Sequence, residues 1–90
     1  MKPEKIIKNN RKRLDRVTKD LVKLIAKRNK LAVKIGKTKK KLNLKITDRK
    51  REKIVLKNAK LYAKKMGVNP NLIEKIMKIL IKHSKKLQAR

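Results

Sequence analysis

Residues 14–35 read LDRVTKDLVKLIAKRNKLAVKI, and their apolar side chains have the spacing of one face of a long helix. These apolar positions, which we call the apolar seam, are Leu14, Val17, Leu21, Leu24, Leu31 and Ile35. Successive positions lie three or four residues apart once Arg28 is counted between Leu24 and Leu31. Such a seam is typical of a helix packed against other helices. The stretch therefore predicts a helical fold.

Arg28 is the one charged residue in a place where the seam calls for an apolar side chain. A buried guanidinium is costly unless an anion or a hydrogen-bonding partner meets it. A side chain of this length can also bury its stem and carry the charge out to water. Taken alone, Arg28 leaves both interpretations open.

The pattern on either side of the seam predicts an all-α chain with three helices. The first runs from about Glu4 to Lys41, and residues 42–47 have no helical period and are expected to form a loop. Asp48 is a suitable N-cap for a second helix, which ends near Gly67. Asn69-Pro70 opens the third helix as a cap followed by proline at the first helical position.

Length and composition bound the class of protein. We expect residues 1–90 to form one domain, whose small core favours association with partner subunits. Cysteine is absent and His83 is the one histidine, so we expect neither thiol chemistry nor a metal site nor a cofactor. There is no apolar run long enough to cross a membrane and no signal-peptide pattern at the start, which predicts a cytoplasmic protein.

The charge balance is extreme, with 32 Lys and Arg against 6 Asp and Glu and a net charge of +26. Such a chain attracts polyanions non-specifically, so a basic helical nucleic-acid-binding protein is one interpretation. However, 25 of the cations are Lys and 7 are Arg, and Tyr62 is the one aromatic residue. Base recognition and base stacking favour Arg and aromatic rings, so much of the lysine is expected to be a solvated coat.

Ser84 and Gln88 are the one serine and the one glutamine of the chain, and they lie four residues apart on one helical face. Exposed polar positions in this sequence are almost always Lys, which suggests that these two were selected for hydrogen bonding. The alternative is a frayed last turn in which Gln88 faces water.

Three cations of the first helix can be related by helical geometry. Lys39 follows Arg28 by eleven residues, which is about 16 Å along the axis and a rotation of about 20°. The two could hold a small dianion between them. Arg11 precedes Arg28 by seventeen residues, about 26 Å away and rotated by about 100°. It could reach the same ligand from an antiparallel partner chain, so one shared site for all three requires a dimer.

Asp48, Arg51 and Glu52 begin the second helix. Acidic side chains in the first turn of a helix cap N–H groups and complement the helix dipole. By themselves, Asp48 and Glu52 are best explained in that way. In a cationic pocket a carboxylate would also accept a hydrogen bond from a ligand hydroxyl. Glu52 is the better candidate because it lies inside the helix.

Taken in order, these residues resemble the all-helical class of chorismate mutases over essentially the whole chain. The resemblance rests on Arg11, Arg28-x-x-Leu-Ala, Lys39, Asp48-x-x-Arg51-Glu52 and Ser84-x-x-x-Gln88. It implies an intertwined homodimer with a long first helix, two shorter helices and two equivalent active sites. Each site would combine seven positions of one chain with Arg11 of the partner subunit.

The resemblance also implies a reaction and a role for each residue. Chorismate, a small dianion, rearranges to prephenate within one molecule, in phenylalanine and tyrosine biosynthesis. Arg28 and Arg11 of the partner subunit would bind the two carboxylates, with support from Ser84. Lys39 and Gln88 would be catalytic and donate to the ether oxygen as it becomes negative. Glu52, helped by Asp48, would accept a hydrogen bond from the ring hydroxyl, and Arg51 would orient these acids.

Three rival interpretations remain open. A nucleic-acid-binding protein would explain the charge but not the position of Arg28. A cationic amphipathic membrane binder is suggested by residues 73–87 in isolation, although the other helices need that apolar face. The same fold could also act as an isochorismate pyruvate lyase.

Overall fold

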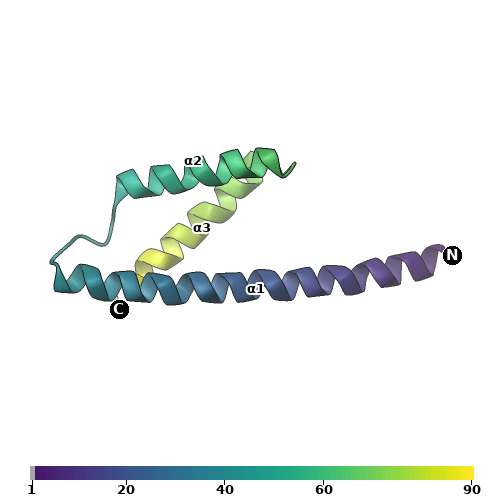
Figure 1. The fold of residues 1–90 in the computed structure, drawn as a ribbon, viewed down its shortest axis with the longest axis horizontal. Coiled ribbons are helices and arrows are strands. Elements are labelled where there is room, and N and C mark those ends of the chain that lie inside the picture. Colours follow the sequence, from purple (N-terminus) through teal and green to yellow (C-terminus); the bar gives the residue numbers. More distant parts are fainter. Residues whose placement is uncertain (1) are drawn as a thin grey trace. The chain divides into compact units, whose positions relative to one another are not determined.

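The computed structural model describes residues 2–90, and the regular structure in that range is entirely α-helical (Figure 1). Its helices are α1 (Pro3–Lys41), α2 (Arg49–Lys65) and α3 (Pro70–Gln88). The predicted all-α class and the order of one long and two shorter helices are confirmed. Within the described residues there is no helix long and apolar enough to cross a membrane.

The helix ends are formed by the caps that the sequence predicts. The Asp48 side chain accepts a hydrogen bond from the Arg51 N–H at 3.0 Å and starts α2. The Asn69 side chain likewise accepts from the Asn71 N–H at 2.8 Å, and Pro70 takes the first position of α3. These side chains satisfy N–H groups that a helix start leaves without a backbone partner.

The end of α2 depends on Gly67, whose φ of 70° lies in the left-handed region. The Gly67 N–H donates to Lys64 O at 3.2 Å, and the Val68 N–H donates to Ala63 O at 2.8 Å. These two bonds make the Schellman motif, in which glycine is the residue that adopts the left-handed conformation without strain.

The chain divides into two compact units, one up to Lys30 and the other Leu31–Arg90. In the second unit, α2 packs against α3, and α3 returns to the last turns of α1 (Figure 1). The buried residues within the described part of the chain are Ala32, Gly36, Ala63, Ser84 and Leu87. This is a small core, and none of these residues carries a large apolar side chain except Leu87.

The apolar seam is open to solvent in a single chain. Its residues keep half or more of their surface exposed, from 50% at Ile35 to 64% at Leu24. Burying a leucine or valine side chain contributes about 1.5–3 kcal/mol. The seam therefore represents a large apolar surface that this chain alone leaves in water.

Candidate active site

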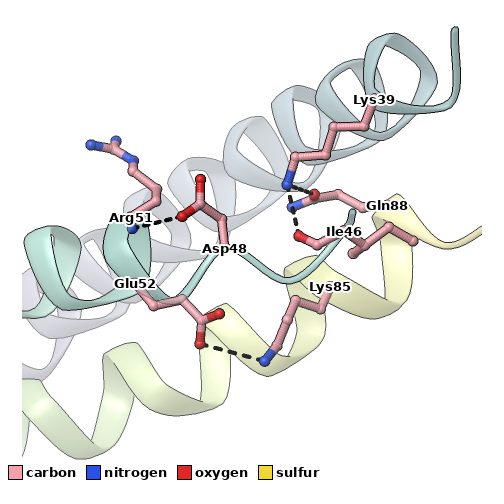
Figure 2. Close-up of polar contacts among 7 residues, drawn as sticks. All are labelled: Lys39, Ile46, Asp48, Arg51, Glu52, Lys85 and Gln88. Atoms are coloured by element: carbon pink, nitrogen blue, oxygen red, sulfur yellow. Dashed lines mark hydrogen bonds and ion pairs between the residues drawn. The ribbon is translucent and has the colours of Figure 1, made fainter. Parts of the chain in front are cut away.

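Lys39 and Gln88, the two predicted catalytic residues, meet between α1 and α3. Figure 2 shows the Lys39 ammonium donating to Gln88 Oε1 at 2.8 Å and to the Ile46 carbonyl oxygen at 2.7 Å. Both side chains are half-buried. Because Oε1 of Gln88 is engaged by Lys39, the amide N–H groups of Gln88 are the atoms left to donate to another group. The contact brings an ammonium and an amide donor to one place.

Gly36 makes this meeting possible, because it lies where the backbones of α1 and α3 approach most closely. A Cβ atom at position 36 would lie 2.5 Å from Gln88 Cα and 2.6 Å from Gln88 O. Such distances are far inside van der Waals contact, so no larger residue fits without moving a helix. This role of Gly36 was not predicted from the sequence. The signal was available, since a lone glycine inside a helical pattern often marks a close packing contact.

Asp48 and Arg51 lie at the start of α2, and both are exposed. Asp48 binds the backbone N–H of Arg51, as an N-cap does. The Arg51 guanidinium is directed away from Glu52 (Figure 2). In this structure the two residues therefore define the first turn of α2, and the expected orientation of the acids by the Arg51 guanidinium is not seen.

Glu52 reaches from α2 toward α3 and pairs with Lys85 (Figure 2). The Lys85 ammonium lies 3.4 Å from Glu52 Oε1. The other oxygen, Oε2, is buried and has no hydrogen-bond partner within residues 2–90. Lys85 was not predicted from the sequence, because one lysine among 25 carries no signal of its own.

Ser84 is buried, with 8% of its surface exposed, and lies one turn before Gln88 on α3. The helix continues through Gln88, and the Ala89 N–H still donates to Lys85 O. The alternative of a frayed last turn with Gln88 facing water is therefore wrong for this structure.

Six of the eight predicted site residues belong to the Leu31–Arg90 unit: Lys39, Asp48, Arg51, Glu52, Ser84 and Gln88. Arg11 and Arg28 belong to the other unit, in which Arg28 is half-buried and Arg11 is exposed. The second unit combines cationic and amide donors with one buried acceptor. That combination suits an anionic ligand that also carries a hydroxyl group.

Comparison with known proteins agrees with this chemistry. The family model described as chorismate mutase type II matches residues 10–89. The chain belongs to the type II chorismate mutases. The matched residues include all eight predicted site positions, from Arg11 to Gln88.

Several known proteins are similar to this chain over most of its length. A chorismate mutase of Methanocaldococcus jannaschii is 38% identical over 80 residues, which are 89% of this chain and 81% of that protein. A bifunctional chorismate mutase/prephenate dehydratase of Buchnera aphidicola subsp. Schizaphis graminum is 36% identical over 74 residues. The T-protein of Haemophilus influenzae is 32% identical over 78 residues. The chain spans 19% and 21% of the length of these last two proteins.

Proposed function

We propose that this chain is a chorismate mutase, an isomerase that converts chorismate to prephenate in phenylalanine and tyrosine biosynthesis. The observation that carries the proposal is the meeting of Lys39 and Gln88 at 2.8 Å, in a chain that matches the family over residues 10–89. These two donors come from helices at opposite ends of the sequence, and the reaction requires donors at a single oxygen atom.

The rearrangement breaks a C–O bond and forms a C–C bond within one molecule, without an obligatory proton transfer. An enzyme can accelerate such a reaction by holding the reactive conformer and by stabilising charge as it develops. Lys39 and Gln88 donate to the ether oxygen, which becomes negative as its bond breaks. Because this charge is largest in the transition state, these two contacts strengthen there and act on turnover.

The remaining residues bind and orient the substrate. Arg28 and Arg11 of the partner subunit bind the two carboxylates, and Ser84 supports carboxylate binding. Glu52 accepts a hydrogen bond from the ring hydroxyl, consistent with its buried Oε2 atom, which has no hydrogen-bond partner among the described residues of this chain. Asp48 contributes by fixing the first turn of α2, from which Glu52 projects. Arg51 lies in the same turn and orients the acids once substrate is bound.

The active form is an intertwined homodimer with two shared sites. Two features support this proposal: the exposed apolar seam, which needs a covering surface, and the exposed Arg11. Residues 1–90 act as one mutase unit, since the family match over 10–89 crosses the boundary between the compact units at Lys30. The proposed location is the cytoplasm.

The net charge of +26 favours a second property, non-specific binding of polyanions. Such binding is electrostatic and weakens steeply with salt. It requires no defined site and is compatible with mutase activity.

The proposed activity is tested by incubating the purified protein with chorismate and following the loss of ultraviolet absorbance and the formation of prephenate. The variant Lys39→Ala should lower kcat about a hundredfold or more, because it removes a preorganised cation from the reacting oxygen. Lys37→Ala is the matched control, since Lys37 is an exposed lysine of the same helix. Equal turnover in the two variants would contradict the role of Lys39. Release of pyruvate from isochorismate, without conversion of chorismate, would indicate the lyase instead.

A further inference from the structure

Lys85 and Glu52 form an ion pair between α3 and α2, next to the proposed site residues (Figure 2). Lys85 directly follows Ser84 and lies three residues before Gln88. Its side chain is 35% exposed and that of Glu52 is 28% exposed, so the pair is partly shielded from water. Neither the family resemblance nor the sequence pattern assigns a role to Lys85.

The two oxygens of Glu52 have different surroundings. Oε1 lies 3.4 Å from the Lys85 ammonium, whereas Oε2 is buried and has no hydrogen-bond partner in the part of the chain that the structure describes. A buried acceptor without a partner costs free energy, and such atoms are rare in folded proteins. Oε2 is therefore an acceptor prepared for a donor that residues 2–90 of this chain do not supply.

We propose that Lys85 is a positioning residue that binds Glu52 Oε1 and so presents Oε2 to the hydroxyl group of the substrate. This inference rests on the proposed function. The Lys85 charge has a second effect, because the substrate is a dianion and an uncompensated carboxylate beside it would repel it. Lys85 offsets that repulsion while leaving one oxygen of Glu52 available as an acceptor.

A second ion pair between the same two helices provides an internal comparison. Lys60 and Glu74 lie 3.7 Å apart, and their side chains are 38% and 34% exposed. The two pairs are thus similar in separation and exposure. The two pairs differ in their carboxylates. Glu52 has a buried oxygen, Oε2, without a hydrogen-bond partner among the described residues, and Glu74 has no such atom. Loss of either lysine should have a similar effect on folding, but loss of Lys85 alone should affect substrate binding.

The first experiment compares Lys85→Met with Lys60→Met by measuring kcat and KM for chorismate in the intact protein. Lys85→Met should raise KM about tenfold, which corresponds to one charge-assisted hydrogen bond. Its kcat should change little, because the hydroxyl contact is equally strong in substrate and transition state. Lys60→Met should leave both constants near those of the unchanged protein, and Lys85→Arg should restore KM. Lys85→Gln replaces Lys85→Met if the latter does not fold by circular dichroism.

The second experiment asks whether Lys85 acts through Glu52. In a Glu52→Gln background, Lys85→Met should cause little further rise in KM, because the carboxylate that it positions is already gone. A chorismate derivative with its ring hydroxyl methylated cannot donate to Oε2 but is still a dianion, so Lys85→Met should raise its KM less than it raises the KM for chorismate.

Two outcomes overturn the inference while leaving the proposed function intact. The first is equal kinetic constants for Lys85→Met and Lys60→Met in a protein that converts chorismate. The second is the same rise in KM in the Glu52 and Glu52→Gln backgrounds, which would make Lys85 a direct contact of the substrate. If the unchanged protein does not convert chorismate, the proposed function and this inference both fail.

Discussion

Gln88 determines how the proposed site responds to pH, because a carboxamide donates hydrogen bonds without titrating. Its Oε1 accepts from Lys39 at 2.8 Å, which directs the amide N–H groups to another acceptor. A glutamate in this place would be of nearly the same size but would donate only while protonated. Its ordinary pKa is about 4.3, and the neighbouring Lys39 ammonium would favour the charged form.

The variant Gln88→Glu should therefore lose kcat at neutral pH, by about a hundredfold, and begin to recover only as the pH falls below about 4.3. The unchanged protein should stay active at neutral pH and above. The measurement is kcat between about pH 3.5 and 8.5, a range that extends below the ordinary pKa of glutamate, with Gln88→Met as the control, since methionine has no donor at any pH. A pH profile of Gln88→Glu parallel to that of the unchanged protein would contradict the donor role.

At the scale of single residues, the sequence predicted site candidates where a residue departs from its surroundings. Gln88, Ser84 and Arg28 could be recognised because each interrupts a pattern made of lysine or apolar side chains. Lys85 could not, because its role depends on how α3 aligns with α2 and not on its identity. Folding determines which lysine faces Glu52, and in this structure it is Lys85.

At the scale of the elements, the close approach of α1 to α3 at Gly36 keeps Lys39 and Gln88 in contact. Gly36→Ala would favour α1 as an isolated helix by about 1 kcal/mol. It would also place a Cβ 2.5 Å from Gln88 Cα, a backbone atom that cannot rotate away. Overpacking of this kind costs about 1–3 kcal/mol. We expect the clash to outweigh the helix propensity, so that α1 and α3 separate.

Gly36→Ala should consequently lower both the melting temperature and kcat, because the Lys39 to Gln88 contact is displaced. Gly67→Ala is the matched control: the left-handed φ of 70° makes alanine unfavourable there, but the added Cβ meets open space. It should lower the melting temperature while the folded fraction keeps its kcat. Unchanged kcat in folded Gly36→Ala would show that the close approach is not needed for catalysis.

Helix limits were predictable from the sequence because local chemistry fixes them. Asp48, Gly67 and Asn69 act through bonds to residues at most a few positions away, so their types and order suffice. The Gly36 contact was not predictable, since it joins residues 52 positions apart, as the difference between 36 and 88 shows. Sequence patterns specify helices better than they specify the register in which helices pack.

At the scale of the whole molecule, the exposed seam and the position of Arg11 in the sequence both favour a dimer. Helical geometry requires a dimer only if Arg11 and Arg28 serve one site, because seventeen residues separate them, and the resemblance to the family supplies that condition. Shared sites of this kind have a consequence that a monomer or a dimer with separate sites would not have. If Arg11 is replaced in one chain and Arg28 in its partner, both substitutions fall in the same site, and the second site of that dimer keeps both arginines.

Arg11→Ala and Arg28→Ala should each abolish activity alone, yet a refolded equal mixture should recover about a quarter of it. Half of the dimers are then mixed, and each mixed dimer has one site with both arginines and one with neither. The chorismate assay measures the recovery, and native mass spectrometry confirms that mixed dimers have formed. Each variant refolded with itself is the control and should stay inactive. Mixed dimers without activity would mean that Arg11 does not complete the site of its partner.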